Sequence, residues 1–209
     1  NTPATGSVTV QIVTAPDEPF FLNLNSGNEW TSASGMPEYT EGAGAVILDS
    51  NATVVDDSTD FTGATLSVTL TNGLDTEDHL SFDTSGPLGV VGGTNVQHGG
   101  TTFATLTSGV QTSNDISLSF AFTGNATASF INTLVQAISY NNTNNEPNDT
   151  DRKASFGFVD AGGDNTGTDN NVFIDVIMVN DPPTVTGDLS ATFLEGAQYN
   201  VTTSDLFYN

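Results

Sequence analysis

The chain contains no cysteine and only two basic residues among its 209. The lack of cysteine excludes disulfide bridges and thiolate metal sites. With 25 acidic residues the net charge is −23, and such a surface repels nucleic acids and anionic membranes. No apolar run approaches the roughly 18 residues of a membrane-spanning helix. We therefore expect neither nucleic-acid binding nor membrane insertion.

Sequence patterns of catalytic sites are also missing. His79 and His98 are isolated, and no zinc-protease, serine-hydrolase or phosphate-loop motif occurs. Paired carboxylates could serve a glycosidase, but they carry little information in so acidic a chain. Arg152 and Lys153, the only basic residues, are interpreted as a local ion pair or as the beginning of a strand. The sequence therefore predicts that the protein is not an enzyme.

What the chain does contain is a strand pattern that runs into acidic residues and prolines. Residues 173–179 are β-branched and apolar, and 180–183 read Asn-Asp-Pro-Pro, which ends a strand because proline lacks a backbone donor. Near the start, the alternating residues 8–13 are followed by Ala-Pro-Asp-Glu-Pro at 15–19. Two such boundaries predict a slice of a tandem array.

These boundaries divide the chain into three parts. We expect residues 1–18 to be the last strand and linker of a preceding repeat, 19–183 a complete repeat, and 184–209 the start of the next. Phe193-Leu-Glu-Gly196 echoes Tyr39-Thr-Glu-Gly42, each after an acidic, proline-containing linker. Since Asn1 is not a natural start, the sequence is expected to be a mature or excised piece.

Short alternating segments predict an antiparallel β-sandwich with one helix. Strands are expected at 20–24, 45–48, 52–55, 64–71, 80–82, 90–91, 101–106, 116–122, 154–159 and 172–179. Between about 128 and 138, Phe130, Leu134 and Ile138 recur at helical spacing, and Thr127 is a candidate N-cap. We expect this helix to cover an open end of the core.

Carboxylate and amide oxygens gather near the expected module ends. Such groups repel one another unless a cation lies among them, and Ca²⁺ takes six to eight oxygen ligands. The candidate calcium ligands are Asp17, Glu18, Glu41, Asp56, Asp57, Asp78, Asn180, Asp181 and Glu195. The alternatives are solvated turn residues and a generally acidic surface suited to solubility or salt.

The order of several segments resembles the cadherin-like repeats of giant bacterial surface proteins and RTX-type adhesins. The segments are Tyr39–Leu48, Ala52–Asp57, Phe61–Leu66, Leu134–Asn142 and Val179–Pro183, which together span most of residues 20–183. The resemblance implies a cadherin- or immunoglobulin-like sandwich, secreted to the cell surface and stiffened by Ca²⁺.

The resemblance also implies which ligands meet. By position, Asn180 and Asp181 would meet Glu41, while Asp17 and Glu18 would meet Asp56 and Asp57. The contiguous pair Asp56-Asp57 departs from the family's spaced aspartates, so a single member of the pair is expected to bind. The first linker also lacks the Asn-Asp-x-Pro order, which leaves its ligand set open.

The function expected from these observations is an extracellular structural or adhesive repeat with Ca²⁺ at its joints. Its partners would be neighbouring repeats or subunits, with a cell-surface glycan or protein as a further candidate. One alternative is a carbohydrate- or peptide-binding module that uses loops 25–37 or 86–100. Another is a subunit of a self-assembling filament joined through its terminal segments.

Overall fold

The computed structural model describes residues 18–24, 36–109, 115–168, 170–182 and 195–196. The chain divides into two units, Asn1–Met178 and Val179–Asn209. The described helix and strands all lie in the first unit. Among the described residues, no helix is both long and apolar enough to cross a lipid bilayer.

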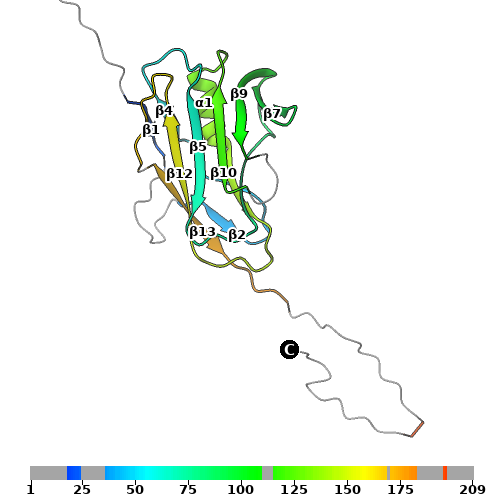
Figure 1. Ribbon diagram of the computed structural model, residues 1–209. Helices are drawn as coiled ribbons and strands as arrows, with labels where there is room; N and C mark the ends of the chain where they lie inside the picture. The colour runs from blue at the N-terminus through cyan, green and yellow to red at the C-terminus, as the bar shows by residue number, and fades with distance from the viewer. Residues whose placement is uncertain (1–17, 25–35, 110–114, 169, 183–194, 197–209) are drawn as a thin grey trace, which may run out of the picture. The chain divides into compact units, whose positions relative to one another are not determined.

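The larger layer of the first unit is an eight-stranded sheet with the order β2-β13-β12-β5-β10-β9-β8-β7 (Figure 1). Its neighbours pair antiparallel except β2, which runs parallel to β13. The strands are β2 (Glu38–Thr40), β13 (Asn171–Ile177), β12 (Arg152–Val159), β5 (Thr65–Thr71), β10 (Ser117–Phe122), β9 (Thr101–Ser108), β8 (Asn95–His98) and β7 (Leu88–Val91).

The second layer consists of smaller pieces. One is a three-stranded sheet, β3-β11-β6, and another is the pair β1-β4. Their bounds are Val46–Ile47 (β3), Ile138–Asn142 (β11), Asp78–Phe82 (β6), Phe20–Leu22 (β1) and Thr53–Val55 (β4), and the helix α1 spans Ala128–Ala137. Aromatic pairs join all three pieces to the large sheet: Phe82–Phe120 at 5.6 Å, Phe21–Phe156 at 5.9 Å and Phe103–Phe130 at 5.5 Å between ring centroids. The predicted all-β sandwich with one short helix is confirmed.

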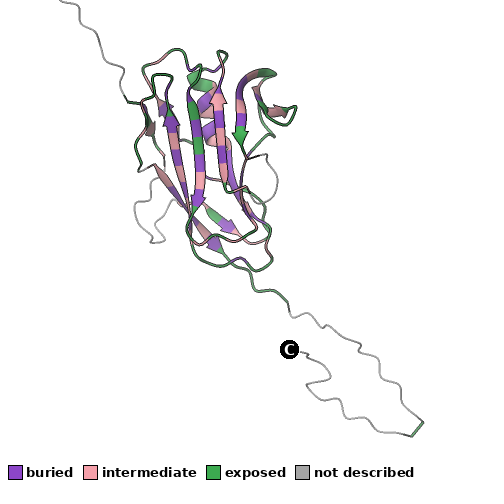
Figure 2. Cartoon of the chain, in the orientation of Figure 1, coloured by how far each residue is buried: buried purple, intermediate pink, exposed green. Residues whose placement is uncertain are grey.

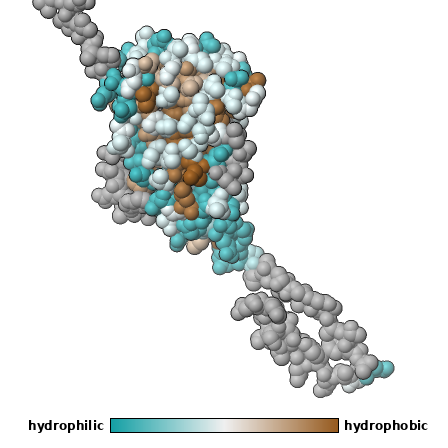
Figure 3. All heavy atoms as spheres, viewed as in Figure 1, coloured by the Kyte–Doolittle hydropathy of each residue, from teal (hydrophilic) through white to brown (hydrophobic). Residues whose placement is uncertain are grey.

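Strict alternation along β5 shows how the sequence specifies the large sheet. Leu66, Val68 and Leu70 are almost fully buried, whereas Thr65, Ser67 and Thr71, which alternate with them, are exposed. Figure 2 shows the resulting alternation of buried and exposed positions along the central strands. The outward face is mostly pale in Figure 3, as expected for serine and threonine. One face of the sheet therefore forms the core and the other meets water.

The helix α1 forms where the apolar spacing predicts it. Thr127 has extended backbone angles, and its side chain accepts a hydrogen bond from the Phe130 N–H, which confirms it as the N-cap. Ile131 and Leu134 face the core and are fully buried. The flank of the helix also bonds β4, because Asn132 Oδ1 accepts the Val54 N–H at 2.8 Å. The helix therefore closes the core beside the β1-β4 pair.

Three strands differ from the sequence-based expectation. Strands β2 and β8 were not predicted, and β11 occupies residues expected as the helix end and a polar loop. The helix stops at Ile138, whose ψ of 132° is no longer helical and which starts β11 at once. Each of these strands has five residues or fewer, so its own periodicity is weak. In addition, β2 and β11 pair with strands that lie far away in the chain.

Candidate functional site

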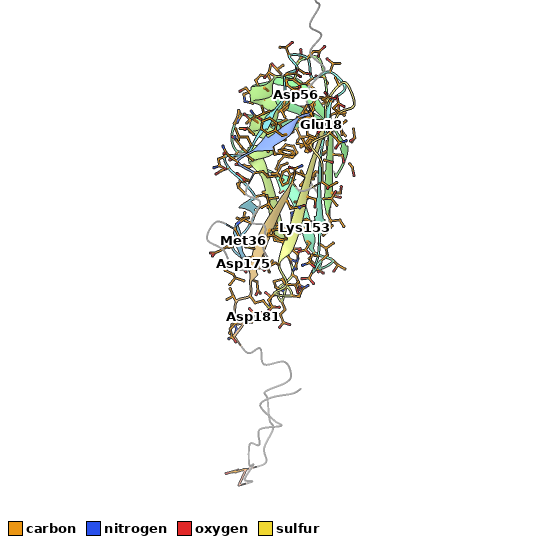
Figure 4. All side chains as sticks on the ribbon, turned by 90° about the vertical axis from the view of Figure 1, so that its left-hand side faces the viewer. Glu18, Met36, Asp56, Lys153, Asp175 and Asp181 are labelled. Atoms are coloured by element: carbon orange, nitrogen blue, oxygen red, sulfur yellow. The ribbon has the colours of Figure 1, made fainter. Side chains whose placement is uncertain are left out.

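The β1-β4 pair brings three predicted ligands to one end of the first unit. Its register aligns Phe20 with Val55, so Glu18 precedes β1 where Asp56 and Asp57 follow β4. Figure 4 shows Glu18 and Asp56 at this same end. The structure thus brings together the described part of the first predicted ligand group. Asp17 lies outside the described residues.

Asp56 has one carboxylate oxygen with no hydrogen-bond partner. Its Oδ1 accepts the Ser58 N–H at 2.6 Å in a tight turn. Its Oδ2 is buried and has no hydrogen-bond partner in the described structure. A buried, unpartnered carboxylate oxygen is costly, and it is the type of atom that Ca²⁺ coordinates. Asp57 beside it is exposed, so the Asp56 side chain fits a cation better than that of Asp57.

The second predicted ligand group is divided between the two units. Glu41 follows β2, and its backbone N–H donates to the Ile177 carbonyl at 2.9 Å, which fixes it beside the end of β13. Asn180, Asp181 and Glu195 belong to the second unit, and all three are exposed. The Asn180 amide donates to the Asp181 carbonyl at 3.2 Å. The predicted meeting of Glu41 with Asn180 and Asp181 stays a prediction.

Asp78 has a different role from the one predicted. Its side chain is fully buried, and Oδ1 accepts hydrogen bonds from Tyr140 Oη at 2.5 Å and Asn142 Nδ2 at 2.7 Å. Oδ2 accepts from Arg152 Nε at 2.8 Å and from the Asp75 N–H at 2.7 Å. Both oxygens and the charge are therefore satisfied within the protein, which argues against Asp78 as a calcium ligand.

Arg152 is the centre of this buried group. Its Nη2 donates to Asp75 Oδ2 at 3.0 Å. Its Nη1 donates to Asn148 Oδ1 at 3.1 Å and to the Thr150 carbonyl. We call the set Arg152, Asp75, Asp78, Tyr140, Asn142 and Asn148 the Arg152 network. It connects β12 with β6 and β11, and so it links the two layers of the sandwich.

The electrostatics of Tyr140 follow from this burial. Desolvation raises the pKa of its hydroxyl far above the usual range, and the hydrogen bond to the Asp78 carboxylate raises it further. The hydroxyl therefore stays protonated at neutral pH and donates to Asp78. A fixed donor suits a structural role in the network.

The sequence pointed to Arg152 only in part. It is indeed the beginning of a strand and half of an ion pair, but its partners Asp75 and Asp78 lie more than 70 positions away. Gly73 shows the close packing around them, because a Cβ there would lie 2.6 Å from the Thr150 side chain. The available signal was that one of only two cations follows a loop rich in asparagine and aspartate.

A shallow hollow of about 300 Å³ lies beside the loop considered for ligand binding, of which only 36 and 37 are described. It is lined by Met36, Pro37, Ile47, Leu48, Asp49, Ser50 and Asn51. Asp49 Oδ1 accepts the N–H groups of Asn51 and Ala52, both at 2.9 Å, so it shapes its own turn. This geometry gives no specific support to carbohydrate binding.

Within the described ranges, no group of three or more histidine, cysteine or acidic side chains is assembled for a metal ion. A calcium site at Asp56 would therefore need oxygens from beyond that set, such as backbone carbonyls or water. No protein-family model matches the chain, and no curated protein or solved structure shows significant similarity to it. The proposed function therefore rests on the geometry and chemistry of the chain itself.

Proposed function

We propose that the chain is an extracellular structural or adhesive repeat, with Ca²⁺ bound where one module joins the next. The observation that carries the proposal is the buried, unpartnered Oδ2 of Asp56 beside Glu18, at the end where the chain enters the sandwich. The resemblance to cadherin-like repeats of bacterial surface proteins supports the same arrangement.

A cation at this position would act on two scales. Locally it would supply the partner that Asp56 Oδ2 lacks and would offset the repulsion between Glu18, Asp56 and Asp57. Between modules it would fix the angle of the linker, because ligands from the linker and from the sandwich would share one ion. The array would then behave as a stiff spacer that holds an adhesive surface away from the cell.

The first test compares calcium binding by two matched variants. Asp56→Asn keeps the shape of the turn but removes the charge. Asp83→Asn is the control, because Asp83 Oδ1 also accepts the N–H two residues on, from Ser85 at 2.8 Å, but the side chain is exposed. We expect millimolar CaCl₂ to raise the melting temperature of the wild type and of Asp83→Asn.

The same addition of CaCl₂ should leave the melting temperature of Asp56→Asn unchanged. Calorimetry measures each melting temperature in CaCl₂ relative to its value in EDTA. At 100 times its Kd, a bound ligand stabilises the folded state by about 2.7 kcal/mol. Equal shifts in both variants, or no shift in the wild type, would contradict the site.

A second test concerns the joint. Small-angle scattering of a longer stretch with adjacent repeats should show a smaller spread of dimensions in CaCl₂ than in EDTA. Binding to a glycan array would instead favour the carbohydrate alternative. Ordered filaments of this chain in negative-stain micrographs would favour the self-assembling alternative.

A further inference from the structure

Strands β2 and β13 form the one parallel pair among the described strands, and they lie side by side in Figure 1. The register pairs Asp175 with Glu38, Val176 with Tyr39 and Ile177 with Thr40. Hydrogen bonds mark both ends of the pair: the Asp175 N–H donates to the Pro37 carbonyl at 3.0 Å, and the Glu41 N–H donates to the Ile177 carbonyl at 2.9 Å.

The direction of the two strands determines how the pair responds to a pulling force. The chain reaches β2 at its amino end and leaves β13 at its carboxyl end, and in a parallel pair these two ends point in opposite directions. Once β1 has been released, tension on the two termini therefore slides β2 and β13 past each other. Their hydrogen bonds share this shear and must break together. A strand pulled sideways from a sheet edge loses its bonds one after another.

Strand β2 also contacts β11 of the smaller sheet through the side chain of Tyr39. Tyr39 is 1% exposed, and its ring meets the Tyr140 ring edge to face at 5.1 Å between centroids. Its hydroxyl donates to the Asn142 carbonyl. Tyr140 and Asn142 both bond Asp78 of the Arg152 network.

The Arg152 network is also connected to β13, because Arg152 of β12 pairs with Ile174 of β13. The two strands under shear are thus held by each other and by one buried polar cluster. Shear between them must also disturb that cluster, which is fully buried at Arg152 and Asp78.

We infer that the β2-β13 pair, anchored by Tyr39 and the Arg152 network, is the tension-bearing element of the first unit. The inference concerns the folded unit alone and holds with or without calcium. Its use in a cell rests on the proposed tandem array, in which neighbours pull on both ends of the module.

The direction of pulling provides the test. The natural chain has no cysteine, so engineered cysteines give unique attachment points for single-molecule force spectroscopy. One full-length variant carries Asn1→Cys and Asn209→Cys, and the other carries Val91→Cys and Asn209→Cys. Val91 is 52% exposed on the edge strand β7.

In EDTA we expect a clearly higher unfolding force for end-to-end pulling than for pulling through β7, which peels the sheet from its edge. Release of β1, whose Phe20 and Leu22 are 50% and 47% exposed, should appear as a small earlier step. Equal forces in the two geometries would overturn the inference. Since calcium is absent, this outcome is independent of the proposed joints.

A matched pair of variants tests the anchor. Tyr39→Phe keeps the ring and removes the bond to Asn142, and it should raise the end-to-end unfolding rate at a given force about fivefold, as expected for one hydrogen bond lost before the transition state. Ser81→Ala removes a hydroxyl bond of the smaller sheet, to Ser139 Oγ at 2.8 Å, and should leave that rate unchanged. Equal effects of the two substitutions would refute the anchor.

Discussion

Two carboxylates face each other where β12 begins and β13 ends. The register of Arg152 with Ile174 places Asp151 opposite Asp175. Partial burial raises the pKa of Asp151, the charge of Asp175 raises it further, and the neighbouring Arg152 opposes the shift. The folded state therefore holds the Asp151 proton to a higher pH than the unfolded chain does.

The sign of the effect on stability follows by linkage. Because the folded-state pKa lies above the unfolded value of about 3.9, Asp151 destabilises the protein at neutral pH, and this cost disappears as the pH falls below the unfolded value. Asp151→Asn should raise the free energy of unfolding at pH 7 by less than about 1 kcal/mol, since water screens a partly exposed pair, and the melting temperature should rise with it.

Thermal melts at pH 7 and near pH 3.5 measure the difference between Asp151→Asn and the wild type, which should shrink at the lower pH. Asp83→Asn is again the control, and at pH 7 this substitution should lower the melting temperature instead of raising it. Hydrogen bonds from the Ser85 N–H and hydroxyl lower the pKa of Asp83, so its charged form stabilises the fold. A gain from Asp151→Asn that is equal at both pH values would show that charge is not the cause.

At the scale of the elements, the sequence predicted those whose own residues carry the pattern. β5 alternates over seven residues and α1 repeats its apolar face over three turns, and both appear within a residue or two of their predicted bounds. β2 could not be predicted, because its three residues are held by β13, which lies more than 130 positions further on. Local periodicity contains no information on such a partner.

In the candidate site, too, some residues could be predicted from the sequence and others could not. Glu18 and Asp56 were predicted together, and the pairing of β1 with β4 brings them to one end. Asp78 was assigned to a metal because it lies in an acidic turn, whereas the fold buries it against Arg152. A sequence shows that a carboxylate needs a counter-charge but does not show whether that charge is an ion or a distant arginine.

The Arg152 network makes a prediction about the contact between layers. Arg152→Met leaves Asp75 and Asp78 without their counter-charge, one of them fully buried, and should reduce the free energy of unfolding by about 3–5 kcal/mol. Lys153→Met is the matched control, because the adjacent Lys153 is partly exposed. This substitution should change stability by no more than about 0.5 kcal/mol. Denaturant titration followed by circular dichroism measures both.

If Arg152→Met does not fold, a milder substitution tests the same contact. Tyr140→Phe removes the hydroxyl and its bond to Asp78 and should cost about 1.5–3 kcal/mol, the range for a hydrogen bond to a charged group. A loss no larger than that of Lys153→Met would show that the network does not stabilise the contact between the layers.

At the scale of the whole molecule, one charge sign dominates. The net charge is −23, and Arg152 is already paired with Asp75 and Asp78 inside the fold. Lys153 is therefore the single basic side chain left to offset the remaining carboxylates. Self-repulsion of this size destabilises a compact state, so the stability of the protein should depend on the ions around it.

Two kinds of ion dependence can be separated. Raising NaCl from about 0.02 to 1 M shortens the Debye length from roughly 20 Å to about 3 Å, so the melting temperature in EDTA should rise steadily for the wild type and for Asp56→Asn alike. Millimolar CaCl₂ at constant ionic strength should then add a saturable increment in the wild type alone. If calcium acts only through screening, that increment disappears at matched ionic strength, and the acidic residues are a diffuse charge layer rather than ligands.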